Sequence, residues 1–237
     1  MQARSSAVAD PDFFRFPHTP HLTWLGEGEP RDDKVLSRDE ADALLAHPVL
    51  VEEKLDGANL GVSLDEAGDF RFQNRGQYLH RPYQGQFARL DAWLETKAEP
   101  LFDALNPNLL VFGEWCAARH SLNYSTLPDW WLVFDVYDRT VGHFWSACRR
   151  DAWAAENRLV TVTNLEAGRF ALRELIDMVG SRQSRYREGP LEGIVVRPDG
   201  GSWSDVRAKL VRADFVQGIG THWRHRPMDW NQLAIKK

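Results

Sequence analysis

The chain has 237 residues, an apolar fraction of 43% and a formal net charge of −5 at neutral pH. This composition excludes a disordered chain, and the acidic balance argues against a protein that coats duplex nucleic acid non-specifically. The sequence has no apolar run long enough to span a membrane, and its two cysteines make neither a disulfide framework nor a zinc quartet. We therefore expect a cytoplasmic protein that makes no membrane contact.

The first half of the chain carries clear turn and capping signals. Ser37 and Glu40 form a capping-box pattern ahead of a helix. Pro100 predicts a break in a later helix, because proline lacks the backbone donor that a helix uses. The expected elements, in chain order, are a flexible tail over residues 1–12, a helix over 41–45, a strand over 50–53, a hairpin over 59–64 and 70–74, and a helix over 84–104.

The second half alternates buried-type strands with amphipathic segments. The expected elements are strands over 109–115 and 131–136, a helix capped by Ser146 that runs to residue 157, a helix over 171–180, a hairpin over 191–197 and 206–211, and a short helix over 214–219. No internal repeat or linker interrupts this order. We therefore expect residues 1–237 to form a single α+β domain.

An ordered series of short motifs begins at Lys54. In chain order the motifs are Glu53–Gly57 (EKLDG), Phe112–Trp115 (FGEW), Phe134–Asp135 (FD), Glu192–Val195 (EGIV) and Arg207–Lys209 (RAK). A lysine with an ordinary pKa of about 10.4 is protonated and cannot attack, so it needs burial, a neighbouring cation or a metal. A lysine followed by two acids and a second lysine is the set that nucleotide transfer through lysine requires.

The acidic and aromatic positions each allow two interpretations. Glu114 ends a buried-type strand, where a carboxylate needs donors such as ribose hydroxyls, or else it is a surface residue. Phe134 either packs in the core or stacks on a purine. Asp135 lies in an apolar run and needs a cation or hydrogen-bond donors. Glu192 has the hard carboxylate that magnesium prefers.

The two cations near the end of the series share one face of a strand. Arg207 and Lys209 are two residues apart, so they project to the same side. This arrangement suits a polyphosphate. The alternative is an exposed strand edge that charge protects from pairing.

Together the five motifs resemble the covalent nucleotidyltransferase superfamily, which contains the polynucleotide ligases and messenger-RNA capping enzymes. Asn59 follows Gly57 by two residues, where RNA ligases of the nick-sealing phage type carry Asn and DNA ligases usually carry Arg. The stretches that look like a bacterial RNA-ligase family of this branch are residues 16–22, 74–79, 113–115 with 119–120, 211–215, 222–223 and 231–233.

This resemblance implies an ATP-dependent and Mg²⁺-dependent RNA ligase, with Mn²⁺ as a substitute metal. Its fold would be a nucleotidyltransferase domain with antiparallel sheets flanked by helices. It would join RNA ends that carry a 5′-phosphate and a 3′-hydroxyl, through a lysyl-AMP and an adenylated RNA 5′ end. About fifty residues precede Lys54 and fewer than thirty follow Lys209, so we expect no appended OB-fold or helical domain. We also expect a separate end-healing protein as a partner.

The resemblance also assigns roles to residues around the nucleotide. Lys54 would be the nucleophile that becomes adenylated, and Glu53 would contact adenine. Phe134 would stack on the adenine ring, and Glu114 would bind the ribose.

Further roles concern phosphate, metal and RNA. Asp135 and Glu192 would support metal and lysine chemistry, with both acting as metal ligands. Asn59 and Arg75 would serve the phosphate and RNA-end steps.

Arg207 and Lys209 would hold the α-phosphate of ATP. The phage enzymes carry Lys at the position of Arg207, and Arg keeps the charge but not the compact ammonium geometry.

Two other functions stay open. Asn59 speaks against a DNA nick ligase, and an intact nucleophile speaks against a module that only binds RNA ends.

Overall fold

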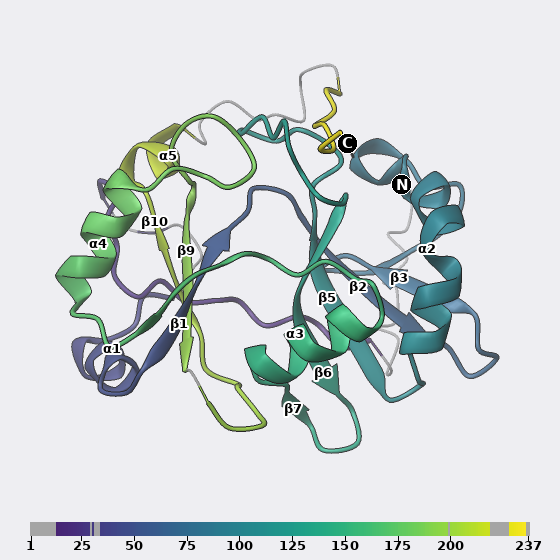
Figure 1. The fold of residues 1–237 in the computed structure, drawn as a ribbon, viewed down its shortest axis with the longest axis horizontal. Helices are drawn as coiled ribbons and strands as arrows, with labels where there is room; N and C mark the ends of the chain where they lie inside the picture. The colour runs from purple at the N-terminus through teal and green to yellow at the C-terminus, as the bar shows by residue number, and fades with distance from the viewer. Residues whose placement is uncertain (1–12, 29, 31–33, 199, 219–227, 236–237) are drawn as a thin grey trace, which may run out of the picture.

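The computed structural model describes residues 13–28, 30, 34–198, 200–218 and 228–235, and its strands form two antiparallel sheets. The first sheet has the order β10-β9-β1-β8 and the second has the order β4-β3-β2-β5-β6-β7. The two sheets lie next to each other, with helices on their outer sides (Figure 1). This arrangement confirms the predicted α+β class with antiparallel sheets flanked by helices.

The first sheet carries three of the predicted strands and one that was missed. Its strands are β1 (Val49–Lys54), β8 (Asn164–Gly168), β9 (Gly193–Pro198) and β10 (Ala208–Val211). The β9–β10 hairpin is antiparallel as predicted. Strand β8 pairs at the sheet edge with most of its side chains partly or fully exposed, so it lacks the apolar run that would mark it in the sequence.

The second sheet contains the other predicted hairpin and the two apolar central strands. Its strands are β2 (Ala58–Leu64), β3 (Phe70–Gln73), β4 (Tyr78–Leu79), β5 (Leu109–Trp115), β6 (Trp131–Asp138) and β7 (His143–Phe144). Strands β4 and β7 have two residues each, which is too short for a periodic signal in the sequence.

Two helices begin at the caps that the sequence predicts, whereas the helix expected from residue 84 begins at Leu90. The helices are α1 (Arg38–Leu45), the short 3-10 turn η1 (Gly85–Phe87), α2 (Leu90–Ala104), α3 (Ala147–Glu156), α4 (Leu172–Ser181) and α5 (Ala213–Gly218). Ser37 and Glu40 form the predicted capping box of α1, and Ser146 caps α3.

The predicted break near Pro100 is wrong. Helix α2 continues through Pro100 to Ala104. A proline removes one backbone donor, and here the helix is held by its buried face, which includes Trp93, Leu94 and Leu101. Packing of that face against the second sheet outweighs the lost hydrogen bond.

Each sheet has its own apolar core on its outer side. Leu44 of α1 and Leu175 and Val179 of α4 pack with Val51 and Ile194 of the first sheet. The second sheet packs against α2 through a separate cluster. Because each fully buried aliphatic side chain contributes about 1.5–3 kcal/mol, these two cores hold each sheet against its helices.

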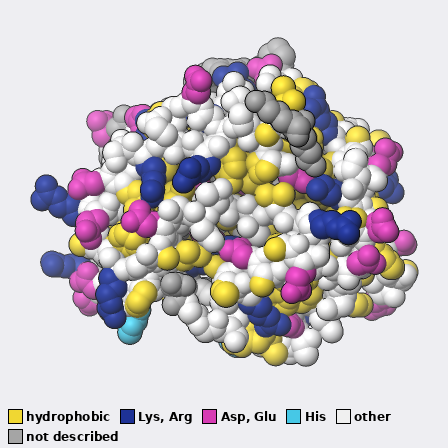
Figure 2. All heavy atoms as spheres, viewed as in Figure 1, with side chains coloured by type: hydrophobic (Ala, Val, Ile, Leu, Met, Phe, Trp, Pro, Cys, Tyr) yellow, Lys and Arg dark blue, Asp and Glu magenta, His cyan; other side chains and the backbone are white. Residues whose placement is uncertain are grey.

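Three sequence expectations concern the surface and the chain ends. The predicted tail over residues 1–12 lies outside the described residues. Within the described ranges, no helix is long and apolar enough to cross a bilayer. On the face shown in Figure 2, Lys and Arg side chains are scattered among Asp and Glu side chains and form no continuous basic stripe in the described part.

Candidate active site

The catalytic lysine expected from the sequence lies at the end of β1, where the two sheets meet. Its side chain lines a cavity of about 580 Å³ that receives side chains from both sheets and from the N-terminal segment. Nine of the ten expected site residues line this cavity: Glu53, Lys54, Asn59, Arg75, Glu114, Phe134, Asp135, Arg207 and Lys209. The tenth, Glu192, is bonded directly to Lys54. The structure therefore brings all ten residues together.

Lys54 and Glu192 form an ion pair at the floor of the cavity. Lys54 Nζ lies 2.5 Å from Glu192 Oε1, and it also donates to the carbonyl of Leu55 at 3.3 Å. Strand pairing brings the two side chains together, since Lys54 lies opposite Gly193, the neighbour of Glu192, in the β1–β9 register. The two sequence motifs are thus joined by one strand pair.

Burial and charge act in opposite directions on this pair. Burial lowers the pKa of Lys54, but the carboxylates of Glu192, Glu114 and Asp56 outweigh it, so the pKa is raised overall. Burial raises the pKa of Glu192 to about 7, although the Lys54 ammonium opposes the shift. The lysine is therefore charged in this state, and its neighbour is a carboxyl that can exchange a proton near neutral pH.

A second carboxyl and an amide face the cavity from the second sheet. Glu114 lies opposite Asn59 in the β2–β5 pair, and its Oε1 accepts from the backbone N–H of Gly57 at 3.0 Å. Burial raises the pKa of Glu114 to about 7. A side chain at Gly57 would place its Cβ 2.6 Å from the carbonyl oxygen of Trp115, so the motif needs glycine for close strand approach.

The amide of Asn59 fits a ligand. Its Nδ2 and Oδ1 atoms are both buried, and neither has a hydrogen-bond partner within the protein. Buried polar atoms of this kind normally have a partner. Because Asn59 lines the cavity, a bound polar molecule is a suitable partner.

Asp135 and Arg207 belong to a buried charge network. Asp135 Oδ1 accepts from Arg197 at 2.8 Å, and Asp135 Oδ2 accepts from Arg207 at 2.5 Å. Glu52 pairs with Arg197 at 2.8 Å and with Arg150 at 2.6 Å. Both oxygens of Asp135 are thus bound by guanidinium groups, which favours a role in holding Arg207 over the expected role as a metal ligand.

Glu52, Arg150 and Arg197 are residues that the sequence analysis missed. All three are nearly inaccessible to solvent. The available signal was the charge of Glu52 and Arg197 within apolar strands, since a buried charge requires a partner.

A bulge in β6 turns Phe134 toward the cavity. The β5–β6 register passes from Asp135 directly to Val133, so Phe134 has no opposite residue. A bulge redirects a side chain, and this one allows Phe134 and its neighbour Asp135 to line the same cavity. Arg150 donates to the carbonyl of Phe134 at 2.6 Å and holds the bulge. The Phe134 ring meets Phe16 of the N-terminal segment edge-on, with centroids 5.3 Å apart.

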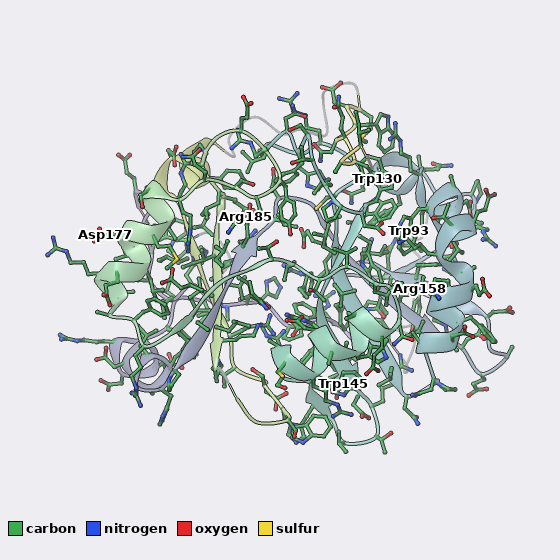
Figure 3. The ribbon with its side chains drawn as sticks, viewed as in Figure 1. Trp93, Trp130, Trp145, Arg158, Asp177 and Arg185 are labelled. Carbon is green, nitrogen blue, oxygen red and sulfur yellow. The ribbon has the colours of Figure 1, made fainter. Side chains whose placement is uncertain are left out.

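Glu53 is bound by the loop that follows α4. Its oxygens accept from the Ser184 hydroxyl at 2.5 Å and from the Arg185 backbone N–H at 2.9 Å, and Arg185 lies beside the end of β1 (Figure 3). Burial raises the pKa of Glu53. These contacts make Glu53 an anchor for the loop, and its contact with adenine stays a prediction.

The remaining cations lie at the opening and along β10. Arg75 is exposed at the cavity rim, and its charge acts on Glu114. Lys209 is half-buried, and its backbone bonds to Pro20 and Leu22 tie β10 to the N-terminal segment. Arg207 lies just before β10, with its guanidinium 4.2 Å from the ring centre of Phe144. The site therefore receives cations from both sheets.

The described residues contain no group of three or more metal-ligating side chains. Mg²⁺ usually keeps several waters and binds through one or two carboxylates together with substrate phosphates. A site with Glu192 and a nucleotide phosphate chain fits that donor set.

A family model for RNA ligases matches residues 47–211. This span covers more than half of the chain and includes every expected site residue. The chain belongs to the RNA ligase family. No curated protein matches the sequence.

Solved structures of RNA ligases share the fold of this RNA ligase family member. A Naegleria gruberi RNA ligase variant with ATP and Mn has a TM-score of 0.64 and 13% identity, over 89% of this chain and 59% of that one. The Naegleria gruberi RNA ligase with pyrophosphate has a TM-score of 0.61 and 17% identity, over 87% of this chain and 64% of that one.

A proposed ATP-dependent DNA ligase from Aquifex aeolicus also matches, with a TM-score of 0.53 and 19% identity, over 84% of this chain and 50% of that one. The chain thus spans between half and two thirds of the length of these proteins. At these identities the likeness concerns the fold.

Proposed function

We propose that this protein is an ATP-dependent RNA ligase in which Lys54 becomes covalently linked to AMP. The observation that carries the proposal is the Lys54–Glu192 ion pair at the floor of a cavity lined by the other motif residues. Membership of the RNA ligase family supports it. A protein that only binds RNA ends would have no use for a lysine held in this way.

The first step joins the lysine to the nucleotide. The Nζ atom of Lys54 gives up a proton and attacks the α-phosphorus of ATP, so a P–N bond forms. The bond from the α-phosphorus to its bridging oxygen breaks, and pyrophosphate leaves. Glu192, with its pKa of about 7, is placed to accept the proton.

Cations stabilise the charge that develops on phosphate. Arg207 and Lys209 line the same cavity as Lys54, and Asp135 holds the Arg207 guanidinium in place. Fixed charges that point at a developing charge give the largest catalytic effect in reactions of this kind. Mg²⁺ held by Glu192 and phosphate would neutralise further charge and lower the pKa of Lys54.

The rest of the cavity suits the nucleoside. Phe134 faces the cavity with one ring surface for stacking on adenine. Glu114 can accept hydrogen bonds from ribose hydroxyls, and the unpartnered amide of Asn59 can bind a phosphate or sugar oxygen.

The later steps use RNA. AMP passes from Lys54 to the 5′-phosphate of one RNA end, and the 3′-hydroxyl of the other end then attacks that phosphate and releases AMP. A partner that repairs damaged ends would supply the 5′-phosphate and 3′-hydroxyl. We also propose that the nucleotide site lies in one domain formed by residues 1–237.

The proposal is tested by sealing assays with matched substrates. Two nicked duplexes should differ only in the sugars of the terminal nucleotides at the 3′-hydroxyl side. We expect sealing of the junction with RNA sugars at that end and much weaker sealing of the all-DNA junction, because the 2′-hydroxyl and A-form geometry distinguish RNA. Equal sealing of both junctions would favour a DNA nick ligase instead.

A further inference from the structure

The end of the described chain forms a strap across a loop of the active site. We call residues 228–235 the C-terminal strap and residues 116–127 the β5–β6 loop. The strap lies outside the span that the family model matches. Backbone hydrogen bonds join the two segments in both directions: Arg119 to Asp229, Asn231 to Ala117, Gln232 to Tyr124, Leu127 to Gln232, and Ala234 to Leu127.

Asn231 is the one strap side chain that enters the loop. It is 2% exposed, and its Oδ1 accepts from the backbone N–H of Tyr124 at 2.8 Å. Its Nδ2 donates to the carbonyl of Cys116 at 2.8 Å and to that of Ala118 at 3.3 Å. One amide therefore ties both ends of a turn in the loop, and its neighbour Gln232 points to solvent.

The β5–β6 loop in turn holds the motif that carries the catalytic lysine. The backbone N–H groups of Ser121 and Leu122 both donate to Asp56 Oδ2 at 2.7 Å. The backbone N–H of Asp56 donates to the hydroxyl of Tyr124 at 2.8 Å. Tyr124 is 1% exposed and thus contacts Asn231 through its backbone and Asp56 through its hydroxyl. Asp56 is two residues from Lys54.

A stacked arginine fixes the beginning of the strap. The guanidinium of Arg89 lies 4.1 Å from the ring centre of Trp230 and 5.5 Å from that of Trp130. Trp130 lies near the upper end of the second sheet, on the side of α2 (Figure 3). The strap is therefore attached to the start of α2 as well as to the loop.

We propose that Asn231 is a positioning residue for Lys54. The amide sets the shape of the β5–β6 loop, the loop sets the turn at Asp56, and this turn directs Lys54 Nζ toward the α-phosphorus. Attack on phosphorus requires closely aligned atoms, and a displacement of about 1 Å can reduce a rate about a hundredfold. The inference rests on the proposed role of Lys54, while the link from Asn231 to Asp56 does not depend on it.

The test compares Asn231→Ala with Gln232→Ala in the full chain. Gln232 is a matched control, because it neighbours Asn231 in the strap but its side chain is exposed. The maximal rate of self-adenylation and the half-saturating ATP concentration are measured in single turnovers. Hydrogen exchange of the Ser121 and Leu122 amides is followed in the same proteins. Ser37→Ala, which removes the α1 cap, controls for a general loss of stability.

We expect Asn231→Ala to lower the maximal rate about 10–100-fold while half-saturating ATP changes less than about threefold. The Ser121 and Leu122 amides should exchange faster in this variant, whereas Gln232→Ala and Ser37→Ala should match the wild type in both measurements. Asn231→Asp keeps the acceptor for Tyr124 and loses the donor for Cys116, so it serves if Asn231→Ala does not fold, and it should show the same changes.

A folded Asn231 variant with wild-type rate, or with unchanged exchange at Ser121 and Leu122, would overturn the inference. An equal rate loss in Ser37→Ala would also overturn it, because the effect would then be general. If the wild type shows no self-adenylation, the proposed function fails, and hydrogen exchange alone still decides whether Asn231 holds the loop at Asp56.

Discussion

Lys54 Nζ lies 2.5 Å from Glu192 Oε1, and the two residues come from motifs that are 138 positions apart in the sequence. The pair keeps the lysine charged and anchored before a nucleotide arrives, since the carboxylates around it raise its pKa. Lys54, the proposed nucleophile, is therefore held charged and inactive, and the proposed attack requires that its proton leave.

The first prediction concerns Glu192 as the proton acceptor. Because burial raises its pKa to about 7, we expect the self-adenylation rate of the wild type to rise with pH through about 7 as this carboxyl ionises. Glu192→Gln should reduce the rate about a hundredfold or more and remove that inflection. Single-turnover rates between pH 6 and 8.5 provide the check. An unchanged pH profile in Glu192→Gln would show that another group takes the proton.

The second prediction concerns stability and Glu114. Its pKa is about 7 in the folded protein and 4.5 as the ordinary value, so the folded state binds this proton more tightly. The stabilisation that this proton gives the folded state is fully present below about pH 4.5 and is lost as pH rises through about 7. Glu114→Gln should therefore be more stable than the wild type at pH 8 by roughly 1–3 kcal/mol, with a smaller difference at pH 5.

Urea unfolding at the two pH values measures this difference. The same variant should adenylate more slowly, because an amide is a weaker acceptor for ribose hydroxyls. A stability gain that is larger at pH 5 than at pH 8 would contradict the assigned shift.

The third prediction separates two roles of Asp135. Both of its oxygens bind arginines, so Asp135→Asn leaves Arg197 and Arg207 with a weaker partner in a buried site. Breaking such a network typically costs about 3–5 kcal/mol, and the loss should be the same with and without Mg²⁺. Thermal unfolding in both conditions tests it, with Asp138→Asn on the same strand as the control. A loss of stability that appears only with Mg²⁺ would restore the metal role of Asp135.

The fourth prediction concerns RNA binding at the cavity rim. Arg75 is exposed there and is placed to contact a phosphate. Arg75→Ala should weaken RNA binding for every sequence alike and reduce the slope of log affinity against log salt by about one. Binding titrations over a salt series measure the slope. Arg38→Ala, which removes an exposed cation on α1, should leave the slope unchanged. The sequence also predicts phosphate contacts from the basic C-terminal stretch around Arg224 and Arg226, and these two residues lie outside the described part of the structure.

The sequence predicted the site better than it predicted how the site is supported. Motif order was enough to bring Lys54, Glu114 and Glu192 into one place, because each motif ends or begins a strand of strong apolar character. The bulge at Phe134 and the Glu52–Arg197 pair could not be derived, since each depends on the register between strands that are distant in the chain.

Two other features could not be predicted from the sequence, for physical reasons. Helix α2 continues through Pro100 because packing of its apolar face outweighs a local propensity. The strap depends on Asn231, an isolated polar residue whose partners Cys116 and Tyr124 lie more than a hundred positions away. Local periodicity carries no information about contacts of this kind.

The central claim is that Lys54 is the adenylated residue. Intact-mass measurement after incubation with ATP and Mg²⁺ tests it most directly. We predict that the wild type and Lys34→Ala, a variant of an exposed lysine paired with Glu40, each gain one AMP, and that Lys54→Ala gains none. A folded Lys54→Ala protein that still gains AMP would contradict the account.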